Sequence, residues 1–178
     1  SQIRQDFSCF GEFGQQGYGY NVTALRSEIA NILGMDRGFK AILVGVGNLG
    51  KALMENFSFS EWGFNLEAAF DIKPDVIGTT VNSVTVLDEA DLPAFLSQNH
   101  IDVAVLCVPK GVAIKVTEKL TSCGIGAIWN FTNVELTEPN SPILVENMHF
   151  SDSLLSLSYY VSDNINEETA RQIRLNRM

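Results

Sequence analysis

From residue 40 onward, short apolar runs alternate with stretches that have helical spacing. The runs are almost wholly apolar, as expected for strands of a parallel sheet that is covered on both faces. We expect strands at about 41–45, 65–71, 84–86, 103–107, 127–130 and 143–145. Helices are expected at about 48–57, 88–98 and 111–122. This alternation predicts an α/β fold, doubly wound around a mainly parallel sheet.

The turn after the first strand carries the strongest chemical signal. It reads Gly45, Val46, Gly47, Asn48, Leu49, Gly50. Gly45 permits a tight turn, Gly47 lets the backbone approach a pyrophosphate, and Gly50 lets the following helix pack closely on the strand. Asp71, about 20 residues further on, can accept hydrogen bonds from both hydroxyls of an adenosine ribose and would repel a 2′-phosphate. The pattern predicts NAD(H) in preference to NADP(H), and the alternative is a structural turn without a ligand.

Ligands of such folds lie outside the carboxyl ends of the strands. Two further strand ends therefore join the candidate cofactor site: Cys107, Val108, Pro109, Asn130, Phe131 and Thr132. Val108 and Pro109 would form an apolar wall for adenine or nicotinamide, and Asn130 could offer its amide to a carboxamide or a ribose. The alternatives are that Pro109 only ends a strand and that Asn130 satisfies a turn. Cys107 is expected to behave as a small buried hydrophobe without a chemical role.

Composition limits the remaining possibilities. The 178 residues, 46% of them hydrophobic, suffice for one domain with extensions but not for an additional substrate domain. The net charge of −9 argues against a large nucleic-acid-binding face on these residues. Cys9, Cys107 and Cys123 show no metal-binding spacing and agree with a reducing compartment. Without an apolar run long enough to span a membrane or a signal-like start, we expect a cytoplasmic protein.

The first twenty residues differ from a plain nucleotide-binding domain. Ile3, Phe7 and Phe10 follow helical spacing, and four glycines between residues 11 and 19 indicate a hairpin. A helix followed by a β-ribbon is the second half of a winged helix-turn-helix, whose recognition helix enters the major groove of DNA. Because no earlier helices are present to bury Ile3 and Phe7, we expect that part of this domain is missing from the chain.

Taken together, these motifs resemble the Rex-type redox-sensing transcriptional repressors, from residue 1 to about 162. The motifs that carry the resemblance are 2–11 (QIRQDFSCFG), 17–22 (GYGYNV), 44–50 (VGVGNLG), 69–71 (AFD), Asn130-Phe131 and 156–160 (SLSYY). The resemblance implies a homodimer with an N-terminal winged-helix domain and a C-terminal Rossmann domain that binds NADH and NAD⁺. Such a repressor releases operator DNA when the ratio of NADH to NAD⁺ rises.

The resemblance also implies a division of the chain. Residues 1–22 would be the remnant of the winged helix, 23–148 the Rossmann domain, 149–163 a helix swapped between subunits, and 164–178 a solvated tail. DNA contacts would come from Gln2, Arg4 and Gln5, in the full-length parent only, and Tyr20 of the wing would join the cofactor site. The apolar face of the swapped helix would consist of Leu154, Leu155, Leu157 and Tyr160. The alternative is a helix packed on its own domain.

Three departures from the family pattern qualify this transfer. Gln5 stands where a lysine is usual, which should weaken contacts with DNA. His149 replaces an aspartate that in the family contacts the partner's wing tyrosine, here Tyr20. Since histidine titrates near neutral pH, sensing could become pH-dependent; the alternative is an exposed residue at the start of a helix. Asn133 replaces a proline, a change we expect to be tolerated.

Two other classes remain as alternatives. An NAD-dependent dehydrogenase would need a general acid or base, and the two histidines are His100, at the wrong end of the predicted sheet, and His149. A coenzyme A or other nucleotide-binding module could use a similar glycine turn, but Asp71 would oppose the 3′-phosphate of coenzyme A. We therefore expect no enzyme, no catalytic residues and no metal site.

Overall fold

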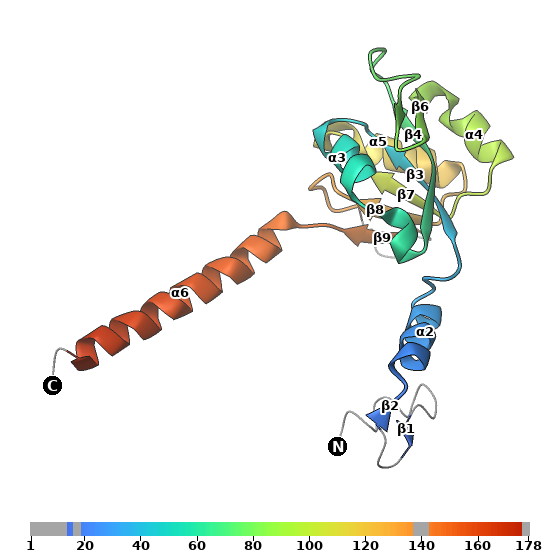
Figure 1. The fold of residues 1–178 in the computed structure, drawn as a ribbon. Helices are drawn as coiled ribbons and strands as arrows, with labels where there is room; N and C mark the ends of the chain where they lie inside the picture. The colour runs from blue at the N-terminus through green and yellow to red at the C-terminus, as the bar shows by residue number, and fades with distance from the viewer. Residues whose placement is uncertain (1–13, 16–18, 137–142, 176–178) are drawn as a thin grey trace.

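A computed structural model describes residues 14–15, 19–136 and 143–175 of the chain. Within these residues lies a seven-stranded sheet with the order β5-β6-β4-β3-β7-β8-β9 (Figure 1). The strands are β3 (Phe39–Val44), β4 (Phe64–Asp71), β5 (Thr80–Val81), β6 (Val84–Asp88), β7 (Val103–Leu106), β8 (Ala127–Asn130) and β9 (Leu144–Asn147). Neighbouring strands are parallel except for β5, which is antiparallel to β6. This arrangement confirms the predicted mainly parallel, doubly wound sheet.

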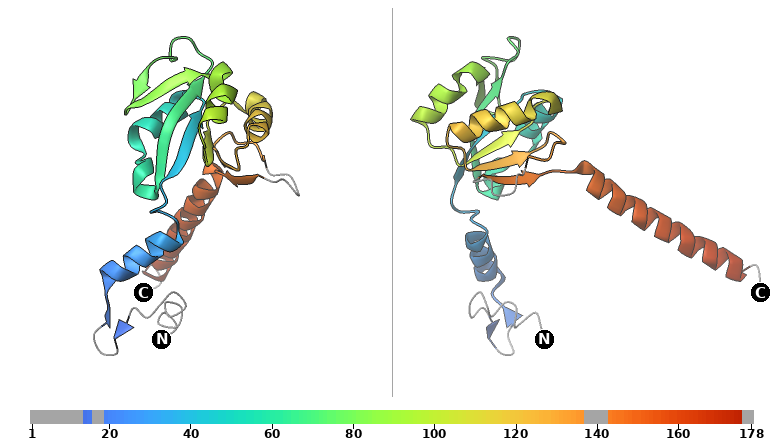
Figure 2. Two further views of the ribbon diagram at one scale, coloured as in Figure 1. Left: turned by 90° about the vertical axis from the view of Figure 1, so that its right-hand side faces the viewer. Right: turned by 180° about the vertical axis from the view of Figure 1, so that it is seen from behind.

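Helices cover the sheet on both faces (Figure 2). On one face lie α3 (Asn48–Asn56) and the short η1 (Phe59–Trp62), and on the other lie α4 (Leu92–Gln98) and α5 (Lys110–Ser122). The side chains of successive residues of β3 point to opposite faces of the sheet. Ile42 lies in the core beneath α4 and α5, and Leu43 lies in the core beneath α3. Both side chains are fully buried, which explains why the strand sequence is apolar without alternation.

The order of strands reverses at β3. The chain moves from β3 outward to β4 and β6, and then returns to β7 on the other side of β3. The carboxyl ends of β3 and β7 therefore separate as their connections run to opposite faces, which leaves a crevice at the end of β3. The glycine turn is located at this point.

Several elements differ from the sequence-based expectation. The helix expected from Asp88 is divided into η2 (Glu89–Asp91), capped by Asp88, and α4. The short β5 and η1 lacked a clear periodic signal. An unpredicted helix, α2 (Val22–Ile32), begins after Asn21, whose side chain accepts a hydrogen bond from the Ala24 N–H at 3.1 Å. This helix precedes the sheet and has no buried residue in the single chain.

The final helix is much longer than expected. It was predicted to end at residue 163, but α6 runs from Phe150 to Leu175. No glycine or proline follows residue 150 to end it. Both views show α6 projecting away from the sheet, so the alternative of a helix packed on its own domain is not what the structure shows (Figures 1 and 2). Leu154 and Leu157 on this helix are 63% and 57% exposed.

At the N-terminal end, β1 (Gly14–Gln15) pairs antiparallel with β2 (Gly19–Tyr20). This pair confirms the predicted hairpin. The expected recognition helix, with Gln2, Arg4 and Gln5, lies outside the described residues, and its contacts with DNA stay predictions. Among the helices that the structure describes, none has the length and apolar character needed to cross a membrane.

Candidate nucleotide-binding site

Two glycines of the turn are required by the fold itself. Gly45 has φ +99°, and a Cβ there would lie 2.7 Å from the backbone carbonyl group of Cys107. A Cβ on Gly50 would overlap the carbonyl oxygen of Gly45, so only glycine lets α3 approach β3 this closely. Both roles agree with those predicted from the sequence.

Gly47 differs, because the protein itself does not need a glycine there. Its φ is −74°, an ordinary value, and a Cβ would meet no atom within 4 Å. Gly47 is the N-cap of α3, and the structure shows no side-chain hydrogen bond to the free N–H groups of the first turn and no acidic residue in that turn. An open backbone beside unsatisfied donors and a positive helix end is the arrangement that binds phosphate.

Asp71 has a second role that the sequence did not reveal. Its buried carboxylate accepts hydrogen bonds from the backbone N–H groups of Val46, at 2.6 Å, and of Ile72 and Lys73, at 2.8 and 2.9 Å. The bond to Val46 ties the end of β4 to the glycine turn. Since a carboxylate has about four acceptor positions, it retains capacity for a ligand hydroxyl.

A cavity of about 340 Å³ adjoins both the glycine turn and Asp71. It is lined by Val44, Gly45, Gly47, Phe70, Asp71, Ile72, Lys73, Glu89, Cys107, Val108, Pro109 and Val112. Of the residues predicted for the site, it brings together two glycines, Asp71 and the 107–109 segment. Val46, Asn48, Leu49 and Gly50 belong to the same turn but are not among the lining residues. Six other lining residues were not predicted for the site. Val44 and Phe70 belong to the ends of β3 and β4, and nothing local marks Ile72, Lys73, Glu89 and Val112 as neighbours of the turn.

In the single chain the Asn130 amide, which was predicted to contact a ligand, is engaged by the protein itself. Its amide nitrogen donates to the Val134 carbonyl and to Asn147 Oδ1, both at 2.7 Å. Its oxygen accepts from the backbone N–H and the hydroxyl of Thr132, at 3.0 and 2.7 Å. Asn130 is buried and its hydrogen-bonding capacity is used within the protein, which favours the alternative role of satisfying a turn; its contact with a cofactor stays a prediction.

Phe131 and Thr132 are buried beside it, outside the lining of this cavity. The Phe131 ring packs against Trp129 with ring centroids 4.6 Å apart. In the single chain both residues support the end of β8 and do not present free polar groups to the glycine turn. Their contact with a cofactor stays a prediction, as does that of Tyr20, whose side chain lies outside what the structure describes.

Cys107 is half-buried at the wall of the cavity. Burial raises the pKa of its thiol from 9.0 to about 12. The thiol is therefore protonated at neutral pH and is a poor nucleophile.

The two histidines lie apart from the cavity. His100 Nε2 is 3.0 Å from Asp102 Oδ1, just before β7 and thus at the end of the sheet opposite the glycine turn, as expected. His149 Nε2 is 2.9 Å from Glu135 Oε1, and the other oxygen of Glu135 accepts a 3.0 Å hydrogen bond from Asn147. His149 thus belongs to a polar network at the start of α6.

The backbone conformation of Asn133 supports the expectation that the replacement of a proline is tolerated here. Its φ is +55°, a left-handed conformation that asparagine adopts readily and that proline, fixed near −65°, cannot adopt. We expect Asn133→Pro to lower the free energy of unfolding by about 2–3 kcal/mol, and Asn133→Gly to leave it nearly unchanged. Urea unfolding measures both. Equal stability of the two variants would show that the loop does not depend on this conformation.

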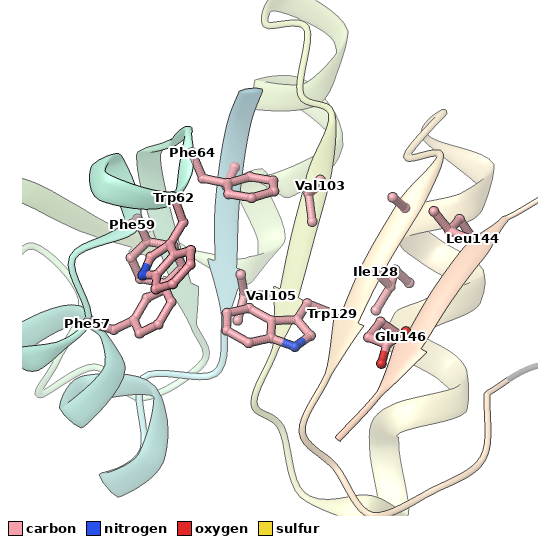
Figure 3. Close-up of a pocket in the computed structure, with 12 residues that line it drawn as sticks. Phe57, Phe59, Trp62, Phe64, Val103, Val105, Ile128, Trp129, Leu144 and Glu146 are labelled. Carbon is pink, nitrogen blue, oxygen red and sulfur yellow. The ribbon is translucent and has the colours of Figure 1, made fainter. Parts of the chain in front are cut away.

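A second cavity, of about 350 Å³, opens on the face of the sheet that α3 only partly covers (Figure 3). We call it the apolar groove. Its lining is Ala41, Phe57, Phe59, Trp62, Phe64, Val103, Val105, Ala127, Ile128, Trp129, Leu144 and Glu146. Glu146 is the one charged member of this set, and Figure 3 shows the aromatic rings of Phe57, Trp62 and Trp129 along it. This groove was not predicted, because its lining comes mainly from five strands that are distant from one another in the chain.

Comparison with known proteins agrees with this geometry. Residues 36–134 match the family model described as "CoA binding domain". The redox-sensing transcriptional repressor Rex of Caldanaerobacter subterraneus subsp. tengcongensis is 46% identical over 163 residues, covering 92% of this chain and 72% of the relative. The Rex protein of Clostridium tetani is 45% identical, over 92% of this chain and 77% of the relative.

Solved structures show the same likeness. RSP, a Rex-family repressor, was solved in complex with β-NAD⁺ and operator DNA, and matches 96% of this chain and 78% of its own at a TM-score of 0.81 and 42% identity. Its complex with β-NADH matches 94% of this chain and 78% of its own at a TM-score of 0.81 and 39% identity.

The doubly wound sheet and its glycine turn define a nucleotide-binding domain of the Rossmann type. With this extent of similarity, the chain belongs to the Rex family of redox-sensing transcriptional repressors.

Proposed function

We propose that this chain binds NADH and NAD⁺ and serves as the cofactor-sensing and dimerising part of a redox-sensing repressor. The observation that carries the proposal is the open backbone at Gly47, placed at the free N-terminus of α3 and beside the buried carboxylate of Asp71. The complexes of RSP with β-NADH and with β-NAD⁺ support this choice of ligand. A full-length protein containing this chain would release operator DNA when NADH binds.

In this proposal the pyrophosphate lies over the backbone of residues 46–50, where N–H groups and the helix dipole compensate its charge. Asp71 accepts hydrogen bonds from the adenosine ribose while it holds the glycine turn through Val46. Val108 and Pro109 form an apolar wall of the same cavity. The nicotinamide extends toward the ends of β7 and β8, where Phe131 and Thr132 support the backbone.

We propose that the chain is a sensor and not an enzyme. Among the described residues, His100 lies at the far end of the sheet, His149 pairs with Glu135, and the thiol of Cys107 is protonated. A hydride-transfer enzyme would need an acid or base within hydrogen-bond reach of its substrate. As a regulator of transcription, the protein would act in the cytoplasm.

We further propose a homodimer. The single chain leaves two apolar surfaces uncovered, one on α6 around Leu154 and Leu157 and the other in the apolar groove. Soluble monomers rarely expose apolar areas of this kind. In a reciprocal exchange, α6 of each copy would be covered by the other copy.

Coenzyme A is the second candidate ligand, because the matching family model carries that description. The ribose of coenzyme A bears a 3′-phosphate, which would meet the buried carboxylate of Asp71. A titration of the protein with NADH, followed by cofactor fluorescence with coenzyme A as competitor, separates the two ligands. Binding of coenzyme A without binding of NADH would overturn the proposed function.

Substitution of Asp71 tests the site directly. We expect Asp71→Ala to weaken NADH binding by about 1–3 kcal/mol, because a charge-assisted hydrogen bond to the ribose is lost. The same change should narrow the preference for NADH over NADPH, since the repulsion of a 2′-phosphate is removed. Asp75→Ala, in the exposed loop that follows, is the control and should bind like the unmodified protein.

Thermal unfolding of Asp71→Ala should accompany the titration, because three backbone N–H groups lose their acceptor. A folded variant with unchanged affinity for NADH would remove Asp71 from the ligand site.

A further inference from the structure

Glu89 is a charged residue of the cavity that has no part in the glycine turn. Glu89 follows directly on Asp88, the last residue of β6, and Asp88 pairs in register with Asp71 of β4. Glu89 therefore lies at the same edge of the sheet as Asp71, one strand further from the glycine turn. Its side chain lines the cavity that Asp71 also lines.

The side chain of Glu89 is held in place from α5. Lys119 Nζ lies 3.1 Å from Glu89 Oε1 and donates a 2.8 Å hydrogen bond to the Glu89 backbone carbonyl. Both side chains are largely buried, at 31% exposure for Lys119 and 22% for Glu89. The other carboxylate oxygen, Oε2, has no hydrogen-bond partner among the described residues. A fixed carboxylate thus keeps one free acceptor.

The other walls suit a flat, apolar ring. Ile72 and Val112 are exposed side chains on β4's end and on α5, and both line the cavity with Val108 and Pro109. When the ribose is held at Asp71 and the pyrophosphate at the glycine turn, the base extends toward β6, because the turn lies on the opposite side of β4. The base would then lie between these apolar side chains with Glu89 at its rim.

We propose that Glu89 recognises the adenine of the bound dinucleotide by accepting a hydrogen bond from its 6-amino group. This inference rests on the proposed function. A carboxylate only accepts hydrogen bonds, and the 6-position of adenine is a donor, whereas hypoxanthine and guanine carry a carbonyl oxygen there. Glu89 therefore selects adenine and repels 6-oxopurines, and Lys119 is a positioning residue that keeps its carboxylate in place.

The test compares NADH with reduced nicotinamide hypoxanthine dinucleotide, which differs at the 6-position of the base. Both ligands are followed by nicotinamide fluorescence. The unmodified chain should bind NADH about tenfold more tightly or better, the effect expected when a charged acceptor faces a carbonyl oxygen in place of a donor. In Glu89→Gln the preference should fall to within about threefold, because the amide can also donate to the carbonyl.

Glu118→Gln is the matched control, since it makes the same change beside Lys119 on α5. It should keep the full preference for NADH. Glu89→Asp, which withdraws the carboxylate by one methylene, should also lose the preference and serves if Glu89→Gln does not fold. Equal binding of the two dinucleotides by the unmodified chain, or an unchanged preference in the Glu89 variants, would overturn the inference. Failure of NADH to bind the unmodified chain would instead overturn the proposed function.

Discussion

Gly50→Ala should lose NADH binding and lower the free energy of unfolding by about 3 kcal/mol, which corresponds to a melting temperature lower by about 6–12 °C. The added methyl group would overlap the carbonyl oxygen of Gly45. Because both atoms belong to or adjoin the backbone, the overlap is relieved only if α3 moves away from β3. The N–H groups at the start of α3 would then no longer converge on the pyrophosphate.

Gly47→Ala provides the contrast. A methyl group there meets no protein atom within 4 Å, so the variant should unfold at the temperature of the unmodified chain. It should nevertheless bind NADH at least about tenfold more weakly, because the methyl group occupies the approach of the pyrophosphate. Circular dichroism and cofactor fluorescence measure the two properties. Normal affinity in Gly47→Ala would place the pyrophosphate elsewhere.

The second large effect is expected at α6. Leu154→Asp combined with Leu157→Asp should convert a dimer into a monomer at micromolar concentration, as measured by sedimentation velocity. The two leucines are three residues apart and share one side of the helix. Burial of each leucine stabilises the dimer by about 1.5–3 kcal/mol. In a reciprocal interface each leucine is buried once on each of the two copies, so its contribution is doubled. Burying aspartates in their place adds the cost of desolvating charge.

Ser162→Asp introduces a similar charge on another side of the same helix and should remain a dimer. If the double variant also remains a dimer, the exposed leucines of α6 are not part of the interface. A monomer in the unmodified chain would contradict the homodimer itself.

The cofactor turn could be predicted because its constraints are local. The spacing of Gly45, Gly47 and Gly50 indicates a tight turn, an open backbone for the pyrophosphate and close packing of the helix on the strand. All three features depend on residues that are neighbours in the chain. Asn130 shows the limit of such reasoning. Its amide looked available at a strand end, but its partners Val134 and Asn147 are fixed by the tertiary fold.

The hydrogen-bond partners of Asp71 and Glu89 are likewise fixed by the tertiary fold and could not be predicted from the local sequence. The hydrogen bond from Val46 to Asp71 joins residues 25 positions apart, and the Lys119 contact joins α5 to the end of β6 across 30 positions. The hydrophobic periodicity of the sequence does not indicate contacts between residues so far apart in the chain. The length of α6 was also underestimated, because the expected end at residue 163 came from the resemblance and the sequence itself contains no stop signal there.

The polar network at the start of α6 has a mechanical consequence. Asn130 at the end of β8 bonds Asn147, Asn147 bonds Glu135, and Glu135 contacts His149, one residue before the helix begins. A helix of 26 residues is about 39 Å long, at about 1.5 Å per residue. A rotation of about 5° at its base therefore moves its far end by roughly 3 Å. If α6 packs on a second copy as proposed, the helix would act as a lever arm, and a shift at the strand ends too small to disturb the sheet would be enlarged to the width of a side chain at its far end.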